Sequence, residues 1–286
     1  MKHRAFIQDE FRWMFPLIFA SVACVSSGTE KNIQLSQTHF LLGADYLNKK
    51  MPEAAKEELF KSIHFNPENK NALQLLGVYF FFEGVHKINI LEREQCLKAT
   101  AAVEQRQEVN KDFREAESYF LKTITIAKRE QQIDSESLIY LANISIHLKK
   151  FDDAIRYAQQ ALENVLYASR HLGLGAQGWA YFQKGQLREA ARDLRQAVYH
   201  EPKFCVGRFR LAKVYFSQNA YDDAIRELTK IAEDSTCPLQ EARQLLGLIY
   251  LKRHEMQLAL ENFQKCKEIS STSCLAEECQ RYEKSL

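Results

Sequence analysis

A small residue that recurs at helical spacing is the feature that most restricts how this chain can fold. Gly43 and Gly77 lie 34 residues apart, and so do Ala190 and Ala224. An internal period of this length is typical of a protein built from repeated helix pairs. Gly or Ala lets two helix backbones approach closely, and a large side chain fills the space beside them. Because one pair cannot cover its own apolar face, we expect neighbouring pairs to stack into a superhelix.

The pattern continues through six units. In the first unit it reads Leu42-Gly43, Tyr46, Ala55, Leu59 and Pro67. This arrangement of large, small and aromatic residues resembles the tetratricopeptide repeat. The resemblance covers residues 36–286 and implies an all-α, right-handed superhelix of about six helix pairs with a C-terminal capping helix. The predicted units are 36–69, 70–134, 135–168, 171–204, 205–238 and 240–273, and the predicted cap is 274–286.

The second unit contains an insertion over residues 84–110. The inserted segment is rich in Glu, Gln, Lys and Ala and lacks proline, which favours longer helices over a loop. We therefore expect a lengthened hairpin that projects from the superhelix. The sequence leaves open whether this hairpin touches a partner.

The amino terminus has the composition of an export signal. A basic start precedes the eleven-residue stretch Trp13–Ala23, whose mostly apolar residues end in small ones. A stretch this short does not span a bilayer, which takes roughly 20 residues in helical form. We predict a signal peptide over residues 1–23 and a polar tether over 24–35. The alternative is a buried first helix.

The residues before Cys24 point to a lipid anchor. Ser21-Val-Ala-Cys24 resembles the lipobox of bacterial lipoproteins, in which the cysteine becomes the acylated amino terminus. Ser21 departs from the Leu of that pattern. Val25 is not the Asp associated with inner-membrane retention, so the resemblance implies the outer membrane. Several acyl chains would anchor the protein stably.

Charge and motifs exclude several classes of function. The chain has 39 basic and 37 acidic residues, without the concentrated basic field typical of nucleic-acid binding. Gly173-Leu-Gly175-Ala-Gln-Gly178 fits a dinucleotide fingerprint but lacks the preceding strand. No catalytic triad, carboxylate pair or metal-ligand spacing is visible. We therefore predict a non-enzymatic protein without metal, nucleotide or other cofactor.

The cysteines beyond Cys24 suggest disulfides. They are Cys96, Cys205, Cys237, Cys266, Cys274 and Cys279, with no C-x-x-C spacing among them. An exported chain meets oxidising surroundings in which disulfides persist. Cys205 and Cys237 mark neighbouring ends of one antiparallel pair, so a bridge between them is reasonable. Cys266 faces the capping helix, where Cys279 is the preferred partner and Cys274 a rival. The alternative is a cytosolic protein with reduced thiols.

First-helix positions that face away from the second helix predict a partner-binding groove. They are Phe40, Phe81, Phe82, Ile139, Trp179, Phe182, Phe209, Phe216 and Leu251. A solvent-facing stripe with this many aromatic residues suggests a surface that is covered by a partner. The partner could be an amphipathic helix or an extended peptide. The alternative is a register shifted by one residue, with several of these side chains in the core. Lys213 and Asn143 alone do not complete the carboxylate clamp of chaperone-binding relatives.

Several short segments together resemble a particular family. They are Cys24-Val-Ser-Ser-Gly28, the Leu166-Tyr167 turn, Pro202–Gly207, Cys237-Pro238, Phe263–Cys266 and Glu277–Arg281. With six repeats, they are similar to the type IV pilus biogenesis lipoproteins of the PilW/PilF/Tgl kind, the Tgl branch above all. The resemblance implies the bridges Cys205–Cys237 and Cys266–Cys279. The insertion, Cys274 and the imperfect lipobox depart from the pattern.

This resemblance implies a function. Such proteins are pilotins, anchored in the outer membrane on its periplasmic face, which promote assembly of the secretin pore used in pilus biogenesis and motility. The predicted partners are therefore the secretin and, through the lipid, the membrane. The alternatives are another exported repeat scaffold in cell-envelope assembly or a cytosolic protein-binding adaptor.

Overall fold

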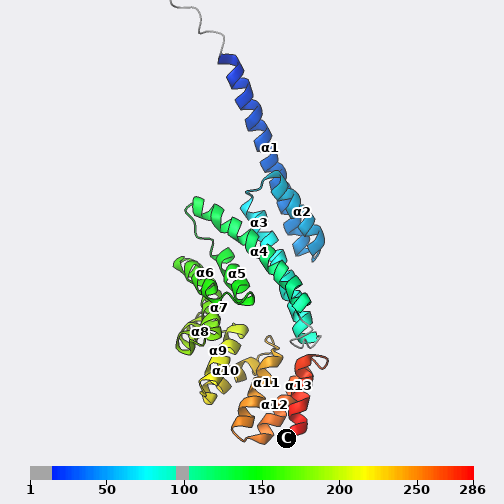
Figure 1. Ribbon diagram of the computed structural model, residues 1–286, viewed down its shortest axis with the longest axis vertical. Helices are drawn as coiled ribbons and strands as arrows, with labels where there is room; N and C mark the ends of the chain where they lie inside the picture. The colour runs from blue at the N-terminus through cyan, green and yellow to red at the C-terminus, as the bar shows by residue number, and fades with distance from the viewer. Residues whose placement is uncertain (1–14, 95–102) are drawn as a thin grey trace, which may run out of the picture. The chain divides into compact units, whose positions relative to one another are not determined.

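The computed structural model describes residues 15–94 and 103–286, and within these ranges it contains helices and no strand. The helices are α1 (Phe15–Asn48), α2 (Pro52–Phe65), α3 (Lys70–Asn89), the π-helix η1 (Ile90–Glu94), α4 (Val103–Arg129), α5 (Ser135–His147), α6 (Phe151–Glu163), α7 (Arg170–Gln183), α8 (Leu187–His200), α9 (Cys205–Ser217), α10 (Tyr221–Glu233), α11 (Gln240–Lys252), α12 (Met256–Ile269) and α13 (Cys274–Ser285) (Figure 1). The all-α prediction is confirmed. From α3 onward, each first helix begins within one residue of a predicted unit start.

The chain forms two compact units, one up to Leu76 and one from Gly77. In the first unit, α1 packs on α2, and a Cβ at Gly43 would lie 2.9 Å from Leu59 Cγ. The Oγ atoms of Ser36 and Ser62 lie 3.1 Å apart. The side-chain amide of Asn69 donates to both hydroxyls. This buried polar cluster ties the start of α3 to the first helix pair.

Close helix approach repeats along the second unit. A Cβ at Gly178 of α7 would lie 2.8 Å from Leu194 Cγ of α8, and one at Gly247 of α11 would lie 2.5 Å from a ring carbon of Phe263 of α12. Leu194 and Phe263 are both fully buried. The small residue and the large partner thus interlock in each pair, as the sequence pattern predicts.

A common turn joins the two helices of most pairs. Lys50, Lys149, Gly185, Asn219 and His254 each adopt a positive φ of 57–76° just after a first helix. The residue that follows donates a backbone hydrogen bond back into the helix, such as Ala220 N to Tyr215 O at 2.9 Å. This left-handed closure satisfies carbonyls that the helix end leaves open. It turns the chain back sharply, so the second helix runs antiparallel to the first.

The second pair is longer than the four pairs that follow it. The helices α3 and α4 have 20 and 27 residues, whereas α2 and α5–α13 have 12–14. Lys87 Nζ of α3 and Asp112 Oδ2 of α4 form an ion pair at 2.6 Å. The insertion thus lengthens both helices; residues 95–102, which include Cys96, lie outside the described part.

The lengthened hairpin does not simply project, as the sequence led us to expect. Its last described segment, η1, contacts the capping helix α13. The physical reason is that stacked pairs accumulate curvature, which brings the cap back toward the second pair. No local sequence pattern encodes such a relation.

Two disulfides between described residues lie in the carboxyl-terminal half. The Cα atoms of Cys205 and Cys237 lie 6.0 Å apart and those of Cys266 and Cys279 lie 6.4 Å apart, with bonded sulfurs in each pair. Cys205 begins α9 and Cys237 follows α10, so the first bridge closes one helix pair. The second joins α12 to the cap. Cys274 is therefore not the partner of Cys266.

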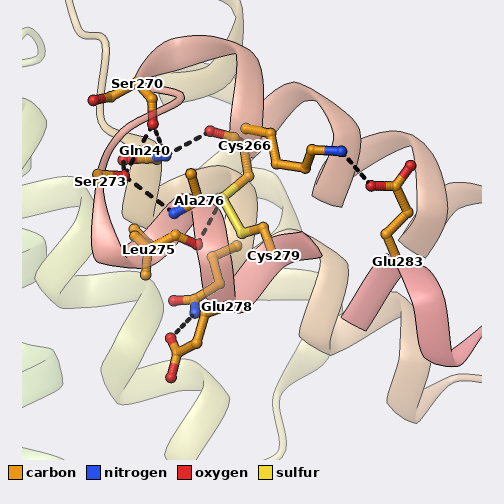
Figure 2. The surroundings of a disulfide bond; sticks show 11 residues. Gln240, Cys266, Ser270, Ser273, Leu275, Ala276, Glu278, Cys279 and Glu283 are labelled. Carbon is orange, nitrogen blue, oxygen red and sulfur yellow. Dashed lines mark hydrogen bonds and ion pairs between the residues drawn. A yellow bond between two sulfur atoms is a disulfide. The ribbon is translucent and has the colours of Figure 1, made fainter. Parts of the chain in front are cut away.

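A network of hydrogen bonds holds the capping helix α13 in place beside the second disulfide (Figure 2). Gln240 Nε2 donates to the carbonyl oxygens of Cys266 at 2.7 Å and Ser270 at 3.1 Å. Ser273 Oγ donates to Gln240 Oε1 at 2.7 Å and accepts from the backbone N–H of Ala276 at 3.1 Å. Ser273 is thereby the N-cap of α13, and one buried glutamine links the last repeat to the helix that closes it.

The amino-terminal helix differs from the sequence-based expectation. The α1 helix runs without a break through residues 24–35, which we expected to form a polar tether. The chain has no proline between Pro16 and Pro52 to interrupt it. Among the described residues, no helix combines the length and apolarity that crossing a membrane requires. The Cys24 side chain lies outside the described part, so the signal peptide and lipidation stay predictions.

The close approach at Gly178 generates a testable prediction. A Cβ there would meet backbone atoms, Ala190 O and Leu194 N, both at 3.2 Å, and these cannot rotate away. We expect Gly178→Val to lower the free energy of unfolding by about 1–3 kcal/mol through overpacking. Chemical denaturation followed by circular dichroism measures this loss.

The control is Gln196→Val, which places the same side chain on an exposed position of α8. We expect it to cost only a few tenths of a kcal/mol, roughly the difference in helix propensity. Equal effects of the two substitutions would contradict the close-packing account.

Candidate partner-binding groove

The first helices of successive pairs present one continuous row of side chains. Trp179 and Lys213 lie 34 residues apart, as do Phe182 and Phe216, so each two occupy equivalent positions on α7 and α9. Neighbouring first helices pack against each other, α5 on α7 and α7 on α9. Residues at equivalent positions therefore become neighbours across the groove.

An aromatic and cationic cluster occupies the middle of this row. The rings of Trp179 and Phe182 stack with centroids 4.8 Å apart at 16°. From α9, the Arg210 guanidinium lies 5.2 Å and the Lys213 ammonium 5.5 Å from the centre of the Trp179 ring. Lys213 Nζ also lies 5.7 Å from the Phe209 ring centre. Both cations thus face aromatic rings, an arrangement worth about 0.5–1 kcal/mol at exposed sites and more when desolvated.

The two cations are poorly compensated. Arg210 Nη1 donates to the carbonyl oxygen of Gly175 at 3.3 Å. Among the described residues, no carboxylate lies within ion-pair distance of Arg210 or Lys213. Burial lowers the pKa of Arg210 to about 10. Burial also lowers the pKa of Lys213, and the nearby Glu241 carboxylate partly opposes that shift.

A second ring cluster lies on α5 and the second pair. The His147 imidazole stacks on Phe113 at 4.6 Å and 10°. Phe81 packs edge-on against Tyr140 at 5.1 Å, and Tyr140 stacks on Phe120 at 4.9 Å. Burial, followed by the positive charge of Arg210, lowers the pKa of His147 to about 4. His147 is therefore a neutral ring near a cation.

The row extends in the other direction to α11. Lys252 Nζ lies 5.9 Å from the Phe216 ring centre. Leu251 is partly buried against the core around α12 and α13, and Phe209 and Phe216 are partly buried against the core of the fifth pair. Half-buried apolar side chains thus lie on α9 itself and on the next first helix, α11.

Not all predicted groove residues lie together. Ile139 is only 4% exposed and belongs to the core, so its assignment to the groove was wrong. The α5 helix is apolar on more than one face, which leaves its register ambiguous. Phe81 is half-buried in the ring cluster, whereas Phe82 is 57% exposed. Phe40 is half-buried in the first unit. Binding by any of these residues stays a prediction.

Sequence reasoning missed Arg210, His147 and Lys252. The missed signal was positional: Lys213 occupies the repeat position of Trp179, and Arg210 precedes it by about one helical turn. In the described ranges, no group of three or more His, Cys, Asp or Glu side chains is arranged to hold a metal ion. The groove offers rings, apolar surface and cations, which suit recognition of a protein segment.

Comparison with known proteins identifies the fold. A family model of the tetratricopeptide repeat matches residues 176–236, the part that contains the Trp179 cluster. The chain has the tetratricopeptide-repeat fold. No curated protein matches it by sequence.

Solved tetratricopeptide-repeat structures resemble nearly the whole chain. PilF of Pseudomonas aeruginosa has a TM-score of 0.64 at 15% identity, over 88% of this chain and 99% of that one. PilW, a widely conserved type IV pilus biogenesis factor, has a TM-score of 0.67 at 16% identity, over 86% and 98%. The Cut9–Hcn1 hetero-tetramer of the APC/C matches with a TM-score of 0.65 at 18% identity, over 95% of this chain and 49% of that one. At these identities the likeness establishes the fold.

The half-buried imidazole of His147, whose pKa burial lowers, predicts a pH dependence of stability. Between pH 6.5 and about 4, unfolded His147 binds a proton that the folded protein excludes, so the free energy of unfolding falls as pH falls. His147→Phe removes this contribution and keeps a ring on Phe113. We expect the stability of the variant relative to wild type to rise by about 1–3 kcal/mol between pH 7 and pH 4.5.

Urea denaturation at a series of pH values measures this difference. His200→Phe, at an exposed position of α8, controls for the loss of a histidine elsewhere. Identical pH profiles of wild type and His147→Phe would show that the buried ring does not exclude the proton.

Proposed function

We propose that this chain is a pilotin: a lipid-anchored protein on the periplasmic face of the outer membrane that binds the type IV pilus secretin and promotes its assembly. The observation that carries the proposal is the end-to-end structural likeness to PilF and PilW, which covers 99% and 98% of those chains. The family-like segments around Cys24 and the carboxyl-terminal cysteines support the same assignment.

The mechanism is binding free energy applied to assembly. A groove that holds a secretin segment favours the conformation and the location in which monomers meet, and a ligand shifts an equilibrium by its difference in affinity for the two states. Acylation at Cys24 would confine the complex to the membrane where the ring forms. No bond of the secretin is made or broken in this scheme.

Another exported repeat scaffold in cell-envelope assembly is the second candidate. The pairs Cys205–Cys237 and Cys266–Cys279 favour an oxidising compartment, which is common to both exported candidates. The disulfides therefore weigh against a cytosolic adaptor, while the likeness to PilF and PilW favours the pilotin.

Secretin assembly in the native host tests the proposal. Deletion of the gene should abolish heat-resistant secretin multimers on immunoblots and abolish surface pili, and the wild-type gene should restore both. Cys24→Ala should leave an unacylated protein, detectable by intact mass, and should reduce multimers in the outer-membrane fraction. Normal multimers and pili in the deletion strain would refute the pilotin assignment.

A further inference from the structure

The middle of the groove contains positive charge that the described part of the chain does not neutralise. Arg210 has a carbonyl oxygen and an aromatic ring as neighbours, and Lys213 has two rings. Elsewhere on the protein, cations commonly meet carboxylates: Arg208 pairs with Glu227, Arg226 with Asp223 and Lys267 with Glu283. Arg210 and Lys213 have no such carboxylate partner among the described residues. They lie in the proposed groove, where a partner segment would bind.

The surroundings make this arrangement costly for the free protein. A partly buried cation loses hydration, and a carbonyl at 3.3 Å and a ring face replace only part of it. His147 on α5, whose pKa the charge of Arg210 helps to lower, is neutral at physiological pH and adds no negative charge. The Glu241 carboxylate on α11 only partly opposes the lowering of the Lys213 pKa by burial. An incoming carboxylate would supply the missing counter-charge to both side chains.

The rings beside the cations restrict what carries that carboxylate. Trp179 and Phe182 on α7 and Phe209 on α9 lie beside the cations, so apolar or aromatic side chains next to the acidic residue would bury well. Half-buried rings also flank this part of the row, Tyr140 on α5 and Phe216 on α9. We therefore expect a bound segment to continue past the cations in both directions.

We propose that Arg210 and Lys213, framed by Trp179, Phe182 and Phe209, form a subsite for an internal acidic side chain flanked by apolar or aromatic residues in a partner protein segment. Arg210 binds the carboxylate through its planar pair of N–H donors, and Lys213 adds charge from the next turn of α9. This deepens the proposed groove function by naming the partner chemistry, and it holds for a secretin or for any other protein partner.

Selection of peptides tests the subsite without assuming the partner. The probe is a displayed library of random peptides, about a dozen residues long, a length that crosses several first helices when extended. Each peptide is fused at both ends and so has no free carboxyl terminus. The purified soluble chain, oxidised, is the bait. We expect enriched peptides to contain Asp or Glu next to Phe, Tyr, Trp, Leu or Met. An absence of enriched peptides, or enrichment without acidic residues, would overturn the proposal.

Affinity measurements with an enriched peptide then assign the contact. Replacing its acidic residue by the amide should weaken binding at least about tenfold, as loss of a charge-assisted hydrogen bond does. Arg210→Gln and Lys213→Gln should each produce a similar loss and should bind the acidic and amide peptides alike. Arg226→Gln, at an exposed position of α10, is the matched control and should bind as wild type does.

Two further readouts distinguish a side-chain subsite from misfolding of the variants and from recognition of a chain end. Arg210→Gln should unfold at the same temperature as wild type or higher, because it removes a poorly compensated cation, so its loss of binding cannot be attributed to misfolding.

A peptide with a free carboxyl terminus and no acidic side chain is the second readout. If such peptides alone bind, the site recognises chain ends and the proposal is wrong. Because the library contains no secretin sequence, failure of the pilotin proposal leaves this result unaffected.

Discussion

The fit of a small residue on one helix against a large residue on the next is the constraint on which the rest of the structure depends. At Gly178 and Gly247, even one added carbon would lie within 2.8 Å of the partner side chain. This closeness leaves each pair only one way to lie together. Because every pair repeats the same fit, each adds to the last with nearly the same rotation, and a superhelix results.

That repetition also determines which exposed side chains become neighbours. Positions 34 residues apart on α7 and α9 become neighbours, so the side chains at a given repeat position line up across the groove. In this chain Trp179 lies beside Lys213, and Phe182 and Phe216 occupy equivalent positions on α7 and α9. The scaffold needs only small and large residues inside each pair. The first-helix positions of this row are therefore free to carry other side chains, at the cost of placing Arg210 where no carboxylate of the described residues pairs with it.

The ends of the repeat array require a different solution, since an end pair has no neighbour to cover its apolar face. At the carboxyl end the cap α13 covers the sixth pair and is tied to it by the Cys266–Cys279 bridge and by Gln240. The lengthened second pair reaches the same cap through η1. The groove thus lies within a unit whose last helix is held both covalently and by the inserted hairpin, and a rigid groove loses less entropy when a partner binds.

The sequence by itself determined the number of helix pairs, the start of each first helix from α3 onward and the pairing of Cys205 with Cys237, because these depend on small residues, turns and helix ends close together along the chain. Through the repeat period it also aligned Trp179 with Lys213 and Phe182 with Phe216. Only the tertiary structure decided that Ile139 lies in the core, that η1 contacts α13, and that Arg210 lies beside Trp179 with no carboxylate of the described residues paired to it. Each of these depends on the curvature of the stack and on the crowding around a side chain, which arise from the sum of many packed contacts and leave no mark in any single stretch of sequence.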